Sequence, residues 1–263
     1  MKNDFFATTN YSEMNTKIHK IIYSEITAQA PDHNKVKSKD ELSHERSKIE
    51  VIPQDCLGYL QSCPNDKSVL LMDMANGEVA GGFAYKGTSP LMGQEEKICL
   101  NSNLKTFLSS CSYPLSPNDE LYICNGVQFA KKECDVAITV APKHKINLVC
   151  NGKINYDKMS LYEIEQIRKQ IRMFLFAAEK YDIVIASALG CGAFCNDPFV
   201  VSKLFQLELK NFNVKHIVFC IYRENFSLDN YSVFEQTLLN NYDYPQLKWY
   251  KDFSPKKITQ PYG

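Results

Sequence analysis

Short apolar runs alternate with longer amphipathic stretches along most of this chain. The apolar runs predict buried strands over residues 49–52, 69–72, 121–124, 136–140, 183–186 and 214–221. Apolar residues at helical spacing predict helices over residues 94–108, over residues 161–181 and in a segment that begins near Pro198. Strands that alternate with helices in this way predict an α/β sandwich, in which ligands bind at the carboxyl ends of the strands.

The first part of the chain predicts an N-terminal helical extension. Residues 11–28 are expected to form an amphipathic helix, because their apolar side chains recur at helical spacing: Met14, Ile18, Ile21, Ile22 and Ile26. Residues 31–47 are polar and of mixed charge, which is typical of a linker or an exposed loop. We therefore expect a helical extension and linker over residues 1–47 and one main domain over residues 48–263.

Two turns rich in small residues each follow an apolar run. The first turn spans residues 76–82 and the second spans residues 188–194, and each contains two or more glycines. Backbone N–H groups can approach a pyrophosphate only where side chains are absent. The two turns therefore predict a site for a diphosphate at the ends of two strands.

Composition and charge restrict the class of protein. Of the 263 residues, 44% are hydrophobic and 23% are charged, and the formal net charge is zero. Without a basic field no nucleic-acid partner is expected. The ten cysteines are scattered, which in a chain of this length indicates reduced thiols and a cytoplasmic protein. The first residues do not have the pattern of a secretory leader. The apolar runs are shorter than the ~20 residues needed to span a bilayer, so no membrane partner is expected.

Paired carboxylates follow the first turn and suit acid/base chemistry on an acetal. Gln94, Glu95 and Glu96 open the predicted helix over residues 94–108. Taken alone, such a triplet is more often simply the charged first turn of a helix. The presence of both small-residue turns, one before the triplet and one after it, favours a catalytic pair instead. Simpler interpretations also exist for single residues: Asn76 as a turn former, Asp55 as a helix cap, and Phe194 and Tyr222 as core residues.

The order of these motifs resembles the poly(ADP-ribose) glycohydrolase family, and its bacterial-type branch in particular. The resemblance covers residues 49–223 and rests on Asp-x-Ala-Asn at 73–76, a glycine cluster, Gln-Glu-Glu at 94–96 and Gly-Cys-Gly-Ala-Phe at 190–194. It implies a macrodomain-like three-layer sandwich with a mixed central sheet. It also implies an ADP-ribosyl glycohydrolase that cleaves poly(ADP-ribose) or protein-linked ADP-ribose without a cofactor.

The resemblance also implies roles for single residues. Glu96 would be the catalytic acid/base, and Glu95 would hold the ribose hydroxyls beside the scissile bond. Asp55 would recognise the adenine amine and Tyr222 would stack on the adenine. The other ligand-binding positions, at the distal ribose and the diphosphate, would be Asn76, Ala80, Gly81, Gly82, Phe83, Gln94, Gly190, Cys191, Gly192, Ala193 and Phe194.

Two departures from the family pattern favour an alternative function. Ala80 stands where the family has the first glycine of a triplet, and residues 83–93 form a longer spacer than is usual. An alanine is tolerated there if its φ stays negative and is costly if φ must be positive. These departures favour a catalytically weak ADP-ribose reader, whereas the adjacent glutamates favour the enzyme. An adaptor that acts through its N-terminal helix is a third possibility.

The cysteines and histidines do not indicate a metal site. Cys191 and Cys195 lack a second ligand pair at zinc-like spacing, and we expect ordinary buried thiols. His144 and His216 stand singly in the sequence and are expected to be structural.

Overall fold

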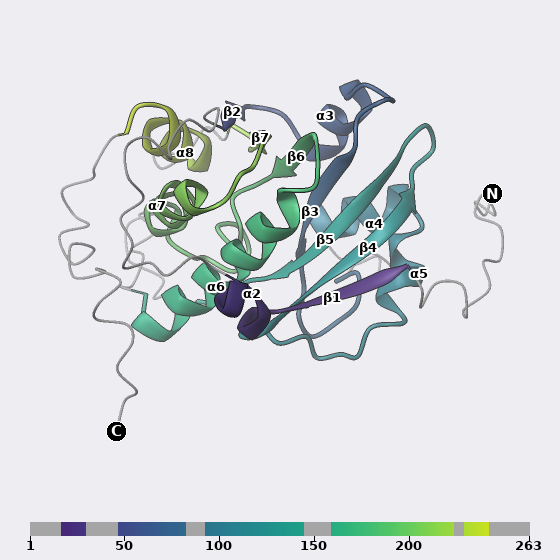
Figure 1. Cartoon of the computed structure of the whole chain (residues 1–263), viewed down its shortest axis with the longest axis horizontal. Helices are drawn as coiled ribbons and strands as arrows, with labels where there is room; N and C mark the ends of the chain where they lie inside the picture. The colour runs from purple at the N-terminus through teal and green to yellow at the C-terminus, as the bar shows by residue number, and fades with distance from the viewer. Residues whose placement is uncertain (1–16, 30–46, 83–92, 145–158, 224–228, 242–263) are drawn as a thin grey trace, which may run out of the picture.

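A seven-stranded mixed sheet forms the centre of the protein (Figure 1). The computed structural model describes residues 17–29, 47–82, 93–144, 159–223 and 229–241. The strand order is β1-β4-β5-β3-β6-β7-β2. The strands are β1 (Ile18–Ile22), β2 (Lys48–Ile52), β3 (Val69–Ala75), β4 (Glu120–Gln128), β5 (Glu133–Val140), β6 (Ile183–Ala186) and β7 (His216–Cys220). Strand β4 is antiparallel to both of its neighbours, and the other neighbouring strands pair in parallel.

Helices cover both faces of this sheet and give three layers. They are α2 (Tyr23–Gln29), α3 (Cys56–Ser62), α4 (Gln94–Asn101), α5 (Leu104–Leu108), α6 (Leu161–Ala178), α7 (Pro198–Glu208) and α8 (Asn230–Leu239), with a 3-10 turn η2 (Leu209–Asn211). Figure 1 shows α2, α6 and α7 in front of the sheet and α4 and α5 behind it. The predicted three-layer sandwich with a mixed central sheet is confirmed.

Strand β3 lies in the middle of the sheet, and its side chains enter two separate cores. Leu70 and Met72 pack in the core that contains α6, α7 and α8. Leu71 and Ala75 face the other way, into the core beneath α3, α4 and α5. Alternation of side chains along a strand produces this division, and burial on both faces explains the continuous apolar run.

Strand β1 contradicts part of the predicted N-terminal helix. Residues 18–22 pair antiparallel with β4, and helix α2 begins only at Tyr23. The β-branched isoleucines Ile18, Ile21 and Ile22 suit a strand, and the edge of β4 supplies the hydrogen-bond ladder that an isolated helix lacks. The prediction of a helix over residues 18–22 is therefore wrong. Residues 1–16 and 30–46, which include most of the expected linker, lie outside the described residues.

The predicted helix over residues 94–108 is interrupted between α4 and α5. The Ser102 hydroxyl donates to the Ile98 carbonyl oxygen, at 2.7 Å, and accepts from the Leu104 N–H, at 3.1 Å. Asn103 Oδ1 accepts from the Gln128 N–H of β4, at 2.9 Å. These side-chain bonds replace the helical ladder at this point and end α4. The other predicted strands and helices are confirmed, whereas α8 was not predicted.

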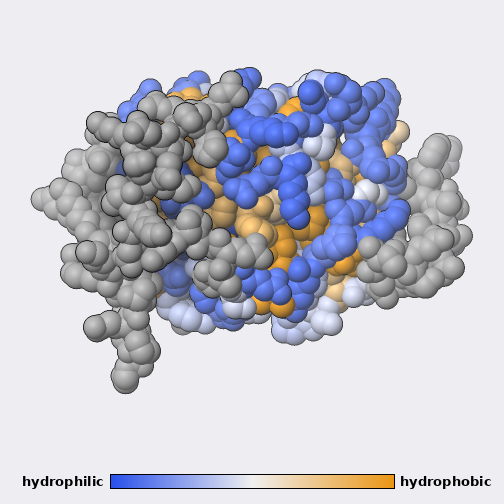
Figure 2. Space-filling view, viewed as in Figure 1, coloured by the Kyte–Doolittle hydropathy of each residue, from blue (hydrophilic) through white to orange (hydrophobic). Residues whose placement is uncertain are grey.

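Polar and apolar residues are mixed on the surface. Figure 2 shows hydrophilic residues across the described part of one face, with hydrophobic ones between them towards the middle. The exposed large hydrophobic residues of the described part are spread over several elements, and the neighbours Leu161 and Tyr162 share α6: Ile22, Leu100, Leu161, Tyr162, Tyr222 and Leu239. Scattered residues of this kind are normal on a protein surface. Within the described ranges, no helix has both the length and the apolar character that crossing a membrane requires.

Candidate active site

The site lies where strands β3 and β6 separate. Their pairing ends at Leu71 and Ile185, whereas β3 stays paired with β5 as far as Ala75. Beyond that point the Gln94 side chain takes the place of the missing strand. Its Nε2 donates to the Met72 carbonyl oxygen, and its Oε1 accepts from the Met74 N–H, at 2.8 Å. The backbone of β3 therefore keeps its hydrogen bonds while the sheet opens at its carboxyl end.

Two adjoining cavities fill this opening. We call the first the glutamate cavity; it measures about 210 Å³ and lies between the end of β3, the start of α4 and residues 189–194. The second, the tyrosine cavity, measures about 230 Å³ and lies between the start of α3, α4 and the end of β7. Met74, Gly93, Gln94 and Gly192 line both cavities. A single elongated ligand could therefore occupy the two together.

The structure brings together most of the residues that the sequence singled out. The glutamate cavity is lined by Asn76, Gln94, Glu95, Glu96, Gly190, Gly192, Ala193 and Phe194, and the tyrosine cavity by Asp55, Gln94, Gly192 and Tyr222. Ala80, Gly81 and Gly82 do not line either cavity, and neither does Cys191, whose thiol is buried in the core. Phe83 lies outside the described residues.

Glu95 is a buried carboxyl group that ties the first turn to β3. Its side chain is only 3% exposed. Oε2 accepts from the Asn76 N–H, at 2.8 Å, and Oε1 accepts from the Gly81 N–H, at 3.0 Å. Burial raises the pKa of Glu95 to about 7, against the opposing effect of these two N–H donors. The group therefore changes its charge near neutral pH.

Glu96 is half-buried, and two glycines make room for its carboxylate. A Cβ atom on Gly82 would lie 2.2 Å from Glu96 Oε1, and one on Gly93 would lie 2.5 Å from Oε2. Gly82 also has a φ of +54°, which favours glycine. Any larger residue at these two positions would displace Glu96 from the edge of the cavity.

The backbone at position 80 is compatible with an alanine. The non-glycine residues with positive φ in the described part are Cys195 and Asn241, so Ala80 keeps a negative φ. Its methyl group packs against the core beneath α4, and its carbonyl oxygen accepts from Lys105 Nζ. The lost glycine is thus accommodated without backbone strain.

Asn76 and Asp55 both have the structural roles that their simpler interpretations predicted. Asn76 Oδ1 accepts from the N–H groups of Glu78, at 2.9 Å, and Val79, at 3.2 Å, and so forms the first turn. Asp55 Oδ1 caps α3 by accepting from the Gly58 N–H, at 2.9 Å. Because each residue also lines a cavity, these roles do not exclude a part in ligand binding.

The two glycines of the second turn have different surroundings. Gly190 has a φ of +71°, and a Cβ atom there would lie 2.2 Å from Asn196 Nδ2 and 2.6 Å from Ala141 Cβ. Asn196 is fully buried and holds the turn by donating to the carbonyl oxygens of Pro142 and Gly190. A Cβ atom on Gly192 would meet no described atom within 4 Å. Gly190 is therefore needed by the turn itself, whereas Gly192 leaves open space where the cavities join.

Residues that follow β5 support the second turn and were not predicted to do so. The His144 N–H donates to the Phe194 carbonyl oxygen, at 2.9 Å, and Nδ1 of the same histidine lies 2.8 Å from Glu163 Oε1. Lys143 Nζ lies 5.6 Å from the centre of the Phe194 ring and 3.1 Å from Glu78 Oε1. The position of these residues just after a strand that pairs with β3 is the signal that could have found them.

Asp73 belongs to the motif at residues 73–76, but the sequence reasoning gave it no role. It is fully buried in the middle of β3, and neither carboxyl oxygen has a hydrogen-bond partner among the described residues. Burial raises the pKa of Asp73 well above its usual value, and the charges of Glu95 and Glu96 raise it further. Residues 69–75 are apolar except for the acidic Asp73. An acidic residue inside an apolar run of this kind indicates a buried carboxyl group.

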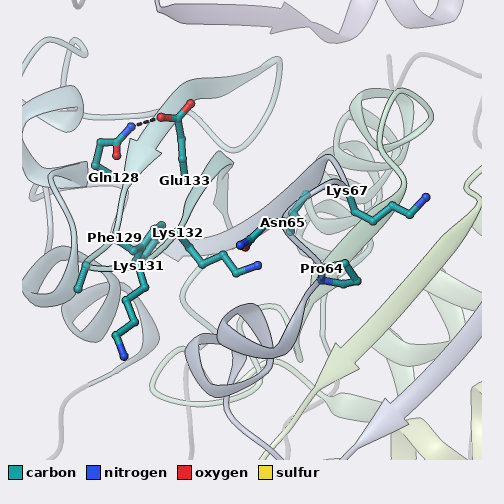
Figure 3. A pocket seen from close by; sticks show the side chains of 10 residues that line it. Pro64, Asn65, Lys67, Gln128, Phe129, Lys131, Lys132 and Glu133 are labelled. Atoms are coloured by element: carbon teal, nitrogen blue, oxygen red, sulfur yellow. Dashed lines mark hydrogen bonds between the residues drawn. The ribbon is translucent and has the colours of Figure 1, made fainter.

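A third cavity, of about 380 Å³, lies at the opposite end of β3 and is separate from this site (Figure 3). Lysines stand at its edge, but Figure 3 shows the side chains of Lys67 and Lys131 pointing away from each other. Lys132 donates to the Cys63 carbonyl oxygen. The charges do not converge on one point, so this cavity is not a candidate anion site.

The described cysteines are free thiols, and most of them are buried. Burial raises the pKa of the Cys191 thiol well above its usual value, so this thiol stays protonated and unreactive. Within the described part of the chain, no three or more His, Cys, Asp or Glu side chains gather in an arrangement able to hold a metal ion.

Comparison with known proteins finds a matching family model and solved structures of similar fold. Residues 2–126 match the family model of the microbial-type PARG catalytic domain, where PARG is poly(ADP-ribose) glycohydrolase. The enzyme from Deinococcus radiodurans in complex with ADP-ribose superposes with a TM-score of 0.65 at 15% identity, over 90% of this chain and 100% of that one. The enzyme from Thermomonospora curvata gives a TM-score of 0.64 at 18% identity, over 86% of this chain and 87% of that one. With the inhibitor ADP-HPD bound, the same enzyme gives a TM-score of 0.61. Comparison with curated proteins gives no match.

The fold is macrodomain-like, as in the structures of the bacterial poly(ADP-ribose) glycohydrolases. Residues 2–126, which are just under half of the 263 residues, match the catalytic-domain model of microbial-type poly(ADP-ribose) glycohydrolases, and the fold of the whole chain is similar to that of the bacterial enzymes. The resemblance seen in the sequence motifs is thereby confirmed. The match to the family model includes the first turn and the paired glutamates but ends before the second turn.

Proposed function

We propose that the chain is an ADP-ribosyl glycohydrolase that cleaves a ribose glycosidic bond in poly(ADP-ribose) or in protein-linked ADP-ribose. One observation carries this proposal: Glu96 and the second turn line one cavity, which adjoins the cavity of Asp55 and Tyr222. A ligand that fills both would have a sugar near Glu96, an anionic link near Gly192 and a base near Tyr222. ADP-ribose has these three parts in this order.

Glu96 is proposed as the acid/base catalyst. Cleavage of the ribose acetal passes through an oxocarbenium-like transition state. As a carboxylic acid, Glu96 would give its proton to the leaving oxygen while the bond to the anomeric carbon breaks. As a carboxylate, it would then accept a proton from the water that attacks that carbon.

Glu95 is proposed to hold both the first turn and the ribose. Each of its oxygens accepts one backbone N–H, and a carboxylate oxygen has a second lone pair for another donor. The ribose hydroxyls would supply those donors. Because burial raises its pKa to about 7, Glu95 would exchange a proton near neutral pH.

The tyrosine cavity is proposed to hold the adenine. Tyr222 is 50% exposed at the edge of this cavity, and its ring is therefore accessible for stacking. Asp55 uses Oδ1 to cap α3, and Oδ2 makes no hydrogen bond to the described residues. This second oxygen would accept a hydrogen bond from the adenine amine.

Replacement of Glu96 by glutamine tests the proposal. We expect Glu96→Gln to keep its affinity for ADP-ribose, measured by calorimetry, and to lose turnover by ~100-fold or more, because glutamine cannot transfer a proton. Turnover is measured as release of ADP-ribose from labelled polymer and from a mono-ADP-ribosylated protein. The relative rates on these two substrates identify which linkage the enzyme prefers.

Glu133→Gln is the matched control, because Glu133 lies on the third cavity at the far end of the sheet. It should release ADP-ribose at the wild-type rate. An unchanged rate in Glu96→Gln would contradict the catalytic role. If the wild-type chain binds ADP-ribose but releases none from either substrate, it is a reader and not an enzyme.

A further inference from the structure

Lys97 is a cationic residue in the lining of the two cavities, whose other charged lining residues are acidic. Asp55, Glu95 and Glu96 all line the two cavities, and among the described lining residues Lys97 alone carries a positive charge. A ligand with a diphosphate would therefore meet three carboxyl groups and a single ammonium group. The electrostatic balance of the site depends strongly on where this ammonium group lies.

Helix α4 brings Lys97 close to the join between the cavities. The Lys97 N–H donates to the Gly93 carbonyl oxygen, at 3.2 Å, so the lysine lies one helical turn after a residue that lines both cavities. The helix thus places Glu96 on the glutamate cavity and Lys97 on the tyrosine cavity. Both side chains lie within reach of a ligand that extends past Gly192.

Without a ligand, the Lys97 ammonium group contacts Tyr222. Lys97 Nζ donates to the Tyr222 hydroxyl, at 3.1 Å, and lies 4.8 Å from the centre of its ring. Within the described part of the chain, Lys97 forms no ion pair with a carboxylate. A cation–π contact of a partly exposed lysine is weak. Phosphate oxygens would therefore replace the tyrosine as the partner of this cation.

Other lysines near the site are already engaged. Lys105 donates to the Ala80 carbonyl oxygen behind the first turn, and Lys143 pairs with Glu78. Neither lysine lines a cavity. Among the described residues that line the cavities, Lys97 is thus the cationic side chain available to a diphosphate.

We propose that Lys97 binds the diphosphate of the ligand and exchanges Tyr222 for phosphate oxygens when the ligand enters. This inference rests on the proposed function and adds a specificity-determining residue to it. Ligands with an adenine but no phosphate would gain nothing from Lys97.

Calorimetric titration of Lys97→Met with ADP-ribose and with adenosine tests the proposal. One charge-assisted contact to phosphate corresponds to an affinity loss of about 10- to 100-fold. We expect that loss for ADP-ribose, with adenosine affinity unchanged. Lys97→Arg, which keeps the charge, should restore most of the ADP-ribose affinity. The loss of ADP-ribose affinity with added salt should also be less steep in Lys97→Met than in the wild type.

Lys169→Met is the matched control, because Lys169 also lies over a tyrosine ring, that of Tyr23, but lies away from both cavities. It should bind both ligands as the wild type does. Equal losses for adenosine and ADP-ribose in Lys97→Met would mean that Lys97 only supports Tyr222, and would overturn the proposal. Unchanged ADP-ribose affinity would overturn it as well, while the proposed function would stand. A wild-type chain that does not bind ADP-ribose would overturn both.

Discussion

The two turns that border the site both contain glycines, but different neighbours require them. In the first turn, a Cβ atom on Gly82 would strike the carboxylate of Glu96, and one on Gly81 would lie 3.2 Å from the side chains of Cys99 and Lys105. In the second turn, Gly190 is enclosed by Asn196 and by the methyl group of Ala141. The first turn is thus fitted around the side chains of a glutamate, a cysteine and a lysine, and the second around an amide and an apolar group.

Gly192 differs from all of these glycines. Its φ lies outside the left-handed region, and a side chain there would meet no described atom within 4 Å. Nothing in the described fold explains why it must be glycine. The difference shows how a glycine needed by the fold can be told from one that leaves room for a ligand: the first is crowded, and the second faces an open cavity.

Substitution of Gly190 should have the largest effect on stability. We expect Gly190→Val to lower the free energy of unfolding by about 3 kcal/mol or more, because a β-branched residue is strained at positive φ and would overlap Asn196 and Ala141. Urea unfolding followed by circular dichroism measures the change. A stability equal to that of the wild type would show that the turn can rearrange, and would remove the distinction between the two glycines.

Substitution of Gly192 should instead remove binding. We expect Gly192→Val to lower ADP-ribose affinity by ~100-fold or more, since its side chain would occupy the join between the cavities. The free energy of unfolding should change by less than about 0.5 kcal/mol, as for an exposed substitution. Calorimetry and urea unfolding on the same preparation check both parts. Wild-type affinity in a folded Gly192→Val would place the ligand elsewhere.

The smallest expected effect is the change in stability that follows from removing the buried carboxyl group of Asp73. The raised pKa of Asp73 in the folded state means that its contribution to stability is complete below its usual pKa of 3.8. This contribution is lost as the pH rises towards the raised value. We expect Asp73→Asn, which cannot ionise, to be more stable than the wild type by up to ~1 kcal/mol at pH 8, with the gain fading by pH 4.

Thermal unfolding at several pH values measures this difference. A gain that does not depend on pH would show that the amide packs better and that the charge of Asp73 plays no part. Ser202→Ala, which removes a buried hydroxyl from α7 on the other side of the sheet, serves as a control without a titratable group. Its effect on stability should be the same at every pH tested.

Local patterns in the sequence predicted the sheet and much of the site. Apolar runs located β3 and β6, and the residues at their ends formed the cavities as expected. The prediction failed where distant parts of the chain compete for the same backbone groups. Residues 18–22 became a strand because β4 offers an unpaired edge, and Ser102 ended α4 through bonds that no periodicity reveals.

The site shows the same limit. Glu95 and Glu96 were recognised as a pair, yet the N–H partners of Glu95 lie 14 and 19 positions away along the chain. The contact of Lys97 with Tyr222 spans 125 positions. Sequence spacing identified the residue types that the chemistry needs, but the direction of each side chain follows from the packing of α4 against β3, which only the three-dimensional structure gives.

The start of α4 explains why three polar residues stand in succession there. Neighbours on an α-helix project about 100° apart, so consecutive side chains point in three directions. Gln94 bonds to the backbone of β3, Glu95 accepts from the backbone of the first turn, and Glu96 lines the glutamate cavity. The first turn of α4 therefore contacts β3, the first small-residue turn and the glutamate cavity at the same time. A shift of this helical turn by one residue would move all three side chains away from their present partners at once. The positions of Gln94, Glu95 and Glu96 therefore depend on one another.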